Sequence, residues 1–339
     1  MAANPLVSII TTYYNSVQLG GFVKSSMECL LNQTYRNIEF ICVNDGSTDS
    51  TLQELEEFAK IDSRIRIYTK ENQKYAQYSK AYGQEKSSGE FIFLFDHDDT
   101  IDLETIQKCL QAFATDPSLD IVAPIVDTKF TNGKPKYTAN LDHYINNISD
   151  YSLRKISGKE AIEKTVGRYD IHIRGLYKSH VFKSHSFQFS EPLLNADEIV
   201  ERLIFENAKY IGTCNAVYTH YIHPDSSAKL PSPKIIDVVR TDVILRQLFK
   251  EKRIYENRKY IFELTAYKNL VNAIKIFHLF SGKMTAEEQM SQRKRLLDSY
   301  AELDKKMVLS QYKGITKIYN TFLLSHFSAL ITFYQYKNK

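Results

Sequence analysis

The chain has 339 residues, of which 43% are hydrophobic and 25% are charged, the composition of an ordinary globular protein. A chain of this length can form one large domain with an appended region. No stretch reaches the roughly 18–20 apolar residues that would span a bilayer, and the first ten residues lack a basic start followed by an apolar core. We therefore expect neither a membrane-spanning helix nor a secretory signal.

The net charge of +4 hides an asymmetry along the chain. Residues 234–339 contain 20 Lys and Arg against 10 Asp and Glu, whereas the preceding part is acidic. This pattern predicts that the C-terminal region contacts something anionic.

Cysteine is sparse, and no Cys-x-x-Cys pair is present. The four cysteines are Cys29, Cys42, Cys109 and Cys214. Their scatter predicts reduced thiols in a cytoplasmic protein rather than a disulfide framework or a zinc site.

Strand and helix patterns alternate over about the first 125 residues. Short β-branched or apolar runs predict strands at 7–11, 38–43, 64–68, 91–95 and 120–126. Helical spacing predicts helices at 19–31, 51–59, 73–87 and 103–114. This alternation is typical of an α/β protein with a parallel sheet and right-handed crossovers.

An acidic turn directly follows the most apolar of these strands. The sequence FIFLFDHDD, residues 91–99, takes the chain straight from a buried strand into Asp96, Asp98 and Asp99. Ligands of open parallel sheets bind outside the carboxyl ends of the strands. Clustered carboxylates there suit Mg²⁺ or Mn²⁺ shared with substrate phosphates, and the alternative is a turn that only caps the next helix.

Other nucleotide-binding signatures are missing. No Gly-x-Gly-x-x-Gly follows the first strand, and no Gly-x4-Gly-Lys-Ser/Thr occurs, which argues against dehydrogenase and P-loop proteins. Beyond residue 126 the pattern becomes irregular, apart from an amphipathic helix that begins at Asp197 and a long helical region after Pro233.

Four motifs in order and at matching spacing resemble family 2 glycosyltransferases. They are SIITTYYN at 8–15, NQTY at 32–35, VNDGSTD at 43–49 and GEFIFLFDHDD at 89–99. The resemblance implies the GT-A fold, a Rossmann-like and mostly parallel sheet flanked by helices, and inverting transfer from a nucleotide sugar. We expect a catalytic domain at 1–230, with a nucleotide-binding half (1–125) and an acceptor half (126–230), and a basic helical region at 234–339.

The same resemblance assigns roles to residues of the donor site. It implies that Thr12, Tyr14 and Asp45 line the base pocket, with Asp45 accepting from the imide of a uracil base. It implies that Asp96 faces the ribose and diphosphate and that Asp98 binds Mn²⁺ or Mg²⁺ on the two phosphates.

Looser matches cover the acceptor half. Gly175-Leu176-Tyr177 resembles a Lys-Leu-Tyr segment of the family, and residues 221–226 resemble a Tyr-Arg-x-His-x-x-Ser segment. By that match His223 would complete the metal shell or contact the diphosphate. A histidine with a purely structural role is the alternative there.

The acceptor-activating residue is expected at the start of the helix that Asp197 opens. The resemblance implies that Asp197 is the general base that deprotonates the acceptor hydroxyl. The family's Glu-Asp pair is Ala196-Asp197 in this chain, so Glu198 is a rival for the role.

A second departure falls on the donor side. The family's Ala-Arg-Asn segment is Ser79-Lys80-Ala81 here. Lys80 supplies the charge of the missing arginine but not its two-pronged geometry.

Two other functions fit parts of the sequence. Asp96-His97-Asp98-Asp99-Thr100 matches Asp-x-Asp-x-Thr, the nucleophile signature of haloacid-dehalogenase-like phosphatases, but on the fourth strand rather than the first. A non-catalytic nucleotide-sugar-binding module is the other alternative, because an arginine and a glutamate of the family are absent.

The resemblance also suggests partners and a location. We expect a UDP-sugar donor and a glycan or lipid-linked acceptor, as in synthesis of capsule, lipopolysaccharide or a similar bacterial surface polysaccharide, with no nucleic acid. The protein would be cytoplasmic or peripheral on the inner face of the cell membrane, and a homodimer is compatible with this.

The last helical segment has apolar residues near helical spacing, with lysines at both ends. They are Ile315, Ile318, Phe322, Phe327, Leu330 and Ile331. This pattern predicts a helix that lies in the interface of an anionic membrane. The alternative is packing on the catalytic domain or on a second subunit.

Overall fold

A computed structural model describes residues 4–130, 135–139, 155–167, 174–222, 231–328 and 331, with the backbone alone at 130 and 135–139. The chain forms two compact units. The first consists of residues 1–164, 172–190 and 200–226, and the second of 165–171, 191–199 and 227–339. The predicted division near residue 230 stays a prediction, and each unit is described by itself.

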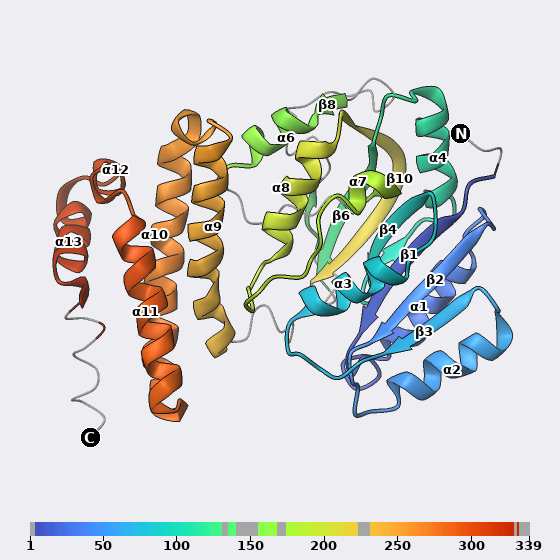
Figure 1. Cartoon of the computed structure of the whole chain (residues 1–339), viewed down its shortest axis with the longest axis horizontal. Helices are drawn as coiled ribbons and strands as arrows, with labels where there is room; N and C mark the ends of the chain where they lie inside the picture. Colours follow the sequence, from blue (N-terminus) through green and yellow to red (C-terminus); the bar gives the residue numbers. More distant parts are fainter. Residues whose placement is uncertain are drawn as a thin grey trace. The chain divides into compact units, whose positions relative to one another are not determined.

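The first unit contains the strands and the helices that pack on them (Figure 1). The strands are β1 (Val7–Tyr13), β2 (Ile38–Asn44), β3 (Ile65–Thr69), β4 (Phe91–Asp96), β5 (Thr100–Ile101), β6 (Ile121–Phe130), β7 (Pro135–Ala139), β8 (Lys155–Ser157), β9 (Leu176–Lys178) and β10 (Tyr210–Ile222). The helices are α1 (Phe22–Leu31), α2 (Thr51–Ile61), α3 (Ala76–Lys86), α4 (Thr105–Thr115), α6 (Gly158–Thr165), α7 (Ser179–Phe182) and α8 (Asp197–Asn207), and α6 and α8 each continue into the second unit.

The described strands form one mostly parallel sheet, as the sequence predicts for its N-terminal half. Its main path has the order β3-β2-β1-β4-β9-β6-β10-β5, and β7 pairs with β6 and β8 with β10 off this path. β1 pairs in parallel with β2 and β4, and β6 pairs in parallel with β10. The sequence gives no sign of the short β9, which lies between β4 and β6 and runs antiparallel to both. β9 therefore joins the two halves of the sheet.

Helices cover both faces of the β3-β2-β1-β4 half. Apolar residues of α1, α2 and α4 share one core cluster with the side chains of β1, β2 and β4 that point to that face, among them Val7, Ile9 and Phe93. The other face of β1 meets α3 so closely that a Cβ at Gly83 would lie 2.4 Å from Cγ2 of Ile10. Alternating side chains of one strand thus serve two layers of helices.

A buried carboxylate ties together the amino ends of β1, β2 and β4. Glu39 Oε1 accepts hydrogen bonds from Ser8 Oγ at 2.6 Å and from the Ser88 amide at 2.7 Å. The Ser8 hydroxyl also accepts from the Gly89 amide at 2.8 Å, and a Cβ at Gly89 would lie 2.7 Å from the Ser8 amide nitrogen. Two motif positions, Ser8 and Gly89, therefore have a structural task at the edge opposite to the expected site.

The pKa of Glu39 lies below its ordinary value. Burial by itself raises this pKa, but the hydrogen bonds from Ser8 and Ser88 and the charge of Arg66 lower it further than burial raises it. The ionised carboxylate therefore stabilises the fold above the ordinary glutamate pKa, and this contribution is lost as the pH falls through the lower pKa of the folded protein.

We expect Glu39→Gln to lower the free energy of unfolding by about 2 kcal/mol at pH 7, because charged hydrogen bonds become neutral ones. Urea unfolding at pH 7 and near pH 4 measures this, and the gap to wild type should narrow at the lower pH. Glu56→Gln, at an exposed position on α2, is the control that should match wild type at both values. A gap of constant size across this range would contradict the assignment.

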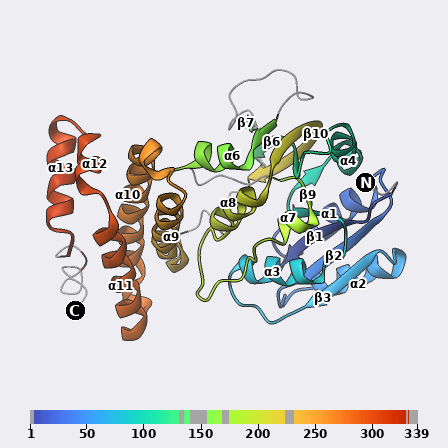
Figure 2. The same ribbon diagram turned by 45° about the horizontal axis from the view of Figure 1, so that its top comes forward.

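The second unit is helical. Its elements are η2 (Pro233–Asp237), α9 (Val238–Glu251), α10 (Tyr255–Phe280), η3 (Ser281–Lys283), α11 (Ala286–Glu302), α12 (Lys305–Ser310) and α13 (Gly314–Ser325). Helices α9, α10 and α11 lie side by side in Figures 1 and 2. None of the helices within the described ranges is long and apolar enough to cross a membrane.

A buried ion pair holds these helices together. Arg246 Nε of α9 donates to Glu263 Oε1 of α10 at 2.7 Å, and both side chains are buried. Tyr255 donates to the same oxygen at 2.6 Å, and the backbone amide of Asp304 donates to Glu263 Oε2 at 2.7 Å. One carboxylate therefore connects α9, α10 and the segment before α12.

The predicted membrane-facing set at the end of the chain is wrong in part. Phe327 and Ile331 are buried, at 3% and 2% exposure, because they pack toward the interior of this unit. Ile315, Ile318 and Phe322 are exposed as predicted, and Leu330 lies outside the described residues.

Candidate active site

Three of the predicted donor-site residues come together at the carboxyl edge of the sheet. Thr12 of β1 is paired in register with Asp96 of β4 on one side and with Val43 of β2 on the other. Asp45 directly follows β2, and its amide donates to the Tyr13 carbonyl at 2.8 Å. Parallel pairing thus brings residues 33 and 84 positions apart from Thr12 to one edge.

Asp45 is buried and forms an ion pair with Lys70. Lys70 Nζ lies 2.6 Å from Asp45 Oδ1. The turn needs a glycine after Asp45, because Gly46 has φ of +66° and a Cβ there would lie 2.8 Å from the Asn72 amide nitrogen. Lys70 also lines a cavity of about 350 Å³ bordered by one side of α3, so open space adjoins the residue that holds Asp45.

Asp99 is the buried centre of the acidic turn. Its carboxylate accepts from the Tyr218 hydroxyl at 2.8 Å and from the Tyr221 amide at 2.9 Å, and His220 Nδ1 lies 3.0 Å away. All three partners lie on β10. Asp99 therefore joins the turn after β4 to the other half of the sheet, which makes it a structural member of the triplet.

Arg174 completes this cluster, and our sequence interpretation missed it. Its guanidinium lies 3.3 Å from Asp96 Oδ2, 3.4 Å from Asp99 Oδ2 and 3.2 Å from His220 Nδ1. It also lies 5.3 Å from the centre of the Tyr218 ring, in cation–π range. Residue 174 immediately precedes the Gly-Leu-Tyr segment, and this neighbourhood is the only sequence signal that could have singled it out.

Protonation states in the cluster follow from burial and charge. Burial by itself lowers the pKa of Arg174, but Tyr218, Asp99 and Asp96 raise it by more than burial lowers it. The pKa of Arg174 therefore lies above its ordinary value, and the guanidinium stays charged. Burial, with help from Asp99 and Asp96, raises the pKa of Tyr218 well above its ordinary value. The phenol is therefore a hydrogen-bond donor to Asp99 at neutral pH.

Asp98 lies in the same turn with a different electrostatic setting. Burial raises its pKa, and the charges of Asp99 and Asp96 add to the effect. A divalent cation at this carboxylate would favour the ionised form.

The donor set fits a cation only if the substrate supplies further ligands. The described residues hold no group of three or more His, Cys, Asp or Glu side chains arranged to bind a metal by themselves. Asp98 offers one hard oxygen donor, which matches a cation shared with phosphate oxygens. His223, the other predicted metal ligand, lies outside the described residues.

The two remaining donor-site residues within the described part of the chain, Tyr14 and Lys80, are both accessible to solvent. Tyr14 follows β1 and is 44% exposed, and Lys80 lies in the middle of α3 and is partly exposed. Their roles stay predictions.

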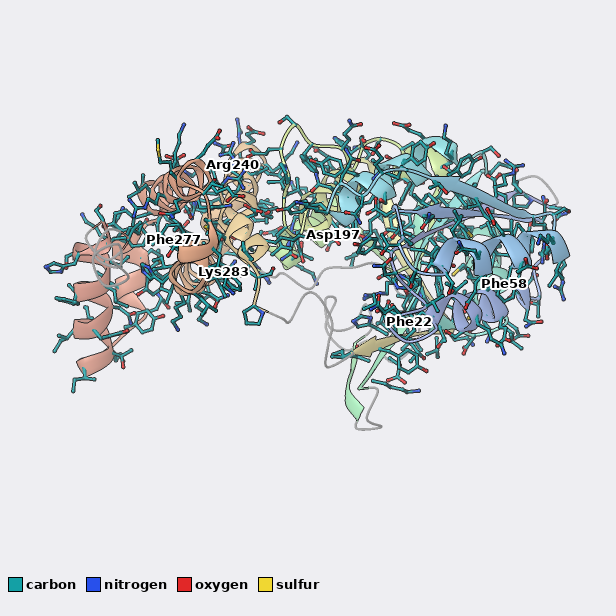
Figure 3. The ribbon with its side chains drawn as sticks, turned by 90° about the horizontal axis from the view of Figure 1, so that it is seen from below. Phe22, Phe58, Asp197, Arg240, Phe277 and Lys283 are labelled. Carbon is teal, nitrogen blue, oxygen red and sulfur yellow. The ribbon has the colours of Figure 1, made fainter. Side chains whose placement is uncertain are left out.

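Asp197 opens α8 as the sequence predicts and lies in the second unit (Figure 3). The turn before it is made by Asn195, whose φ of +59° is tolerated by asparagine. Asp197 is partly exposed, whereas Glu198 is buried at 1% exposure and Ala196 is buried as well. Of the two rival carboxylates, Asp197 is the more exposed to solvent.

We expect Arg174→Met to lower the free energy of unfolding by about 3 kcal/mol, because it removes a cation from the buried Asp99 carboxylate. Arg174→Lys should cost less, since it keeps the charge but not the planar fork. Urea unfolding at pH 7 measures both. Arg36→Met removes an exposed arginine and serves as the control; a loss no larger than that of the control would show that Arg174 does not stabilise the turn.

Comparison with known proteins identifies the class. The family model for glycosyl transferase family 2 matches residues 8–180, about half of the chain. The chain therefore belongs to glycosyl transferase family 2, and its sheet and helices are those of the GT-A fold, as the motifs predict.

Curated relatives support this family. The putative glycosyltransferase EpsH of Bacillus subtilis is 28% identical over 253 residues, which are 69% of this chain and 65% of EpsH. Chondroitin synthase of Pasteurella multocida is 26% identical over 298 residues, 82% of this chain and 28% of that protein. The chain thus spans less than two thirds of the length of each of these two relatives.

Solved structures show the same fold at low sequence identity. S. aureus TarS 1–349 in complex with UDP-GlcNAc has a TM-score of 0.62 and 18% identity, covering 98% of this chain and 92% of that one. The mannosyltransferase PcManGT of Pyrobaculum calidifontis, in complex with GDP-Man and Mn²⁺, has a TM-score of 0.53 and 14% identity, covering 99% and 88%.

Proposed function

We propose that the protein transfers a sugar from a nucleotide donor, a UDP-sugar, to a hydroxyl group of a glycan or lipid-linked glycan, with inversion at the anomeric carbon. The observation that carries the proposal is the meeting of Thr12, Asp45 and the Asp96–Asp99 turn at one sheet edge in a member of this family. The nucleotide-sugar complexes of TarS and PcManGT, which share the fold, support a donor of this class.

The donor would bind along that edge with its base near Asp45. Lys70 holds Asp45 Oδ1 at 2.6 Å, which leaves Oδ2 to accept from the imide of a uracil ring, with Thr12 and Tyr14 lining the pocket. Asp96 would face the ribose and diphosphate. Its contact with Arg174 orients the carboxylate and limits its rotation.

Positive charge for the diphosphate has two sources in this chain. Lys80 lies on α3 where the family has an arginine, and Arg174 is charged and lies against Asp96. A charged group fixed by its neighbours stabilises developing negative charge without reorganising. We assign Arg174 a positioning role and Lys80 a direct contact with phosphate.

Asp98 would bind Mn²⁺ or Mg²⁺ together with the diphosphate oxygens, and His223 is the further ligand that the sequence suggests. Such a cation offsets the charge of the departing nucleoside diphosphate. The family resemblance and the oxygen chemistry of Asp98 support this assignment. The bound PcManGT complex contains Mn²⁺, which supports the same metal class.

The acceptor hydroxyl would lose its proton to Asp197 as its oxygen attacks the anomeric carbon. The bond to the diphosphate breaks on the opposite face, so the configuration inverts. Asp197 is partly exposed at the first turn of α8, whereas Glu198 is buried. This difference in exposure favours Asp197 as the base.

Two alternatives differ in standing. The aspartyl-phosphatase alternative loses its support, because the chain belongs to family 2. In addition, Asp96 ends β4, a strand in the interior of the sheet, and its carboxylate lies against the Arg174 guanidinium. A non-catalytic nucleotide-sugar-binding module would bind the donor but neither transfer nor hydrolyse it.

Removing the metal should weaken donor binding. We expect UDP affinity measured by calorimetry in Mn²⁺ to fall at least tenfold in EDTA, because a cation held by Asp98 would also attract the phosphates. Asp98→Asn should reproduce that loss without lowering the melting temperature. Asp298→Asn, at an exposed position of α11, is the matched control; equal UDP affinity with and without metal would refute the metal assignment.

Replacing the base should affect turnover rather than binding. Asp197→Asn is expected to lower kcat by about 100-fold or more with donor affinity nearly unchanged. Slow donor hydrolysis gives a readout that needs no acceptor. Wild type should hydrolyse a UDP-sugar and Asp197→Asn should not, and absence of hydrolysis and transfer in wild type that still binds UDP would favour the binding module.

Glu198, the buried residue next to Asp197, allows the two candidates for the general base to be compared. Glu198→Gln should reduce kcat less than Asp197→Asn, provided that both variants melt near wild type. The reverse ranking would move the role of base to Glu198.

A further inference from the structure

Helix α13 has one face that is firmly packed. Tyr267 of α10 donates to Asn320 Oδ1 at 2.6 Å, and the Tyr300 hydroxyl of α11 donates to the Leu324 carbonyl at 2.5 Å. The Tyr300 ring also stacks on Phe327 with centroids 4.1 Å apart. These contacts fix the rotation of α13 about its axis, so the opposite face points away from its own unit.

That opposite face is apolar and open. Ile315, Ile318, Tyr319 and Phe322 are 84%, 69%, 61% and 54% exposed. Their spacing of i, i+3, i+4 and i+7 places them in one stripe along the helix. The other exposed large hydrophobic residues are spread over several elements of both units, namely Tyr14, Leu19, Ile61, Leu103, Tyr260, Leu279, Met290 and Leu297.

The charged residues of the segment that carries the stripe, apart from histidine, all have one sign. Residues 305–339 contain six lysines and no aspartate or glutamate. Lys313 and Lys317, next to the stripe, are exposed. An apolar stripe flanked only by cations matches a surface that is apolar below and anionic above.

We propose that the stripe of α13, formed by Ile315, Ile318, Tyr319 and Phe322, docks on an anionic lipid surface. The helix lies in the plane of the interface with these side chains among the acyl chains, while Lys313 and Lys317 contact lipid phosphates. Tyr319 suits the boundary, because its ring is apolar and its hydroxyl is polar.

Charge favours this occupant over a second copy of the chain. A two-fold interface would place each stripe against an identical one, with Lys313 and Lys317 of both copies brought together. Like charges at an interface without acidic partners oppose such pairing. Anionic lipid instead turns each lysine into an attractive contact.

The proposal is tested by vesicle flotation of the full-length protein without nucleotide sugar, so the result does not depend on the proposed activity. Vesicles of phosphatidylcholine with phosphatidylglycerol are compared with phosphatidylcholine alone, at 50 and 500 mM NaCl. The protein should float with the anionic vesicles at low salt, and less at high salt because the lysine contacts are screened.

Two sets of variants separate the contributions. Ile318→Ser with Phe322→Ser should reduce binding at least 30-fold, since it removes two apolar side chains that enter the bilayer. Lys313→Gln with Lys317→Gln should reduce binding to anionic vesicles about 30-fold at low salt, because each lysine near the lipid surface contributes roughly fivefold. All four positions are exposed, so melting temperatures should stay near wild type.

Matched controls change similar residues elsewhere in the second unit. Leu279→Ser with Met290→Ser removes exposed apolar side chains, and Lys283→Gln removes an exposed lysine (Figure 3). Both should bind vesicles like wild type. The proposal is overturned if wild type ignores anionic vesicles at low salt, if the α13 variants bind as wild type does, or if the stripe instead mediates a dimer that Ile318→Ser with Phe322→Ser dissolves in sedimentation.

Discussion

The candidate site depends on one buried carboxylate, that of Asp99. It binds the Tyr218 hydroxyl, His220 and the Tyr221 amide of β10, and it lies against the Arg174 guanidinium. A buried carboxylate is stable only with several donors and a cation around it. The contacts that meet this need also fix the turn that presents Asp96 and Asp98, so the stability of the turn and the geometry of the site have the same origin.

At the opposite edge of the sheet, a second buried carboxylate, that of Glu39, is also surrounded by hydrogen-bond donors. Glu39 gathers Ser8 and the Ser88–Gly89 segment where β1, β2 and β4 begin. Between the two edges, side chains of these strands such as Ile9, Phe40 and Phe93 are fully buried and apolar. Polar interactions therefore link neighbouring segments at both edges of the sheet, while buried apolar side chains fill the middle.

Local patterns in the sequence were sufficient for much of this fold. The strands β1 to β4 and the helices between them follow from runs and periods of a few residues, and the resemblance to the family implies that Thr12, Asp45 and Asp96 belong to one site. Arg174 and β9 could not be predicted in this way. β9 has three residues, and its place between β4 and β6 is decided by partners 54 or more positions away.

The C-terminal helix shows a second limit of sequence patterns. Helical spacing identified apolar residues within α13 and beyond its end, but it could not tell which of them are buried. Phe327 is buried by its stack on Tyr300, whereas Tyr319 was not among the predicted residues and is exposed. Which apolar residues are covered depends on packing against α10 and α11, and the spacing of residues along the sequence does not contain that information.

The positions that depart from the family's motifs differ in role from four of those that match them. Ser8, Gly46, Gly89 and Asp99 match the motifs, and each has a structural reason in close backbone approach or buried hydrogen bonding. Two positions that differ are instead expected to face substrate or lie beside the base, Lys80 in place of an arginine and Ala196 in place of a glutamate. Ala196 is buried, so the family's carboxylate at this position would need partners that an alanine does not. Glu39 and Asp99 hold the scaffold through Ser8, Ser88, Arg174 and residues of β10, so we expect the fold to persist when positions 80 and 196 change. We therefore expect differences in donor and acceptor choice to arise at 79–81 and around 196, while the sheet edge that carries Thr12, Asp45 and Asp96 is kept.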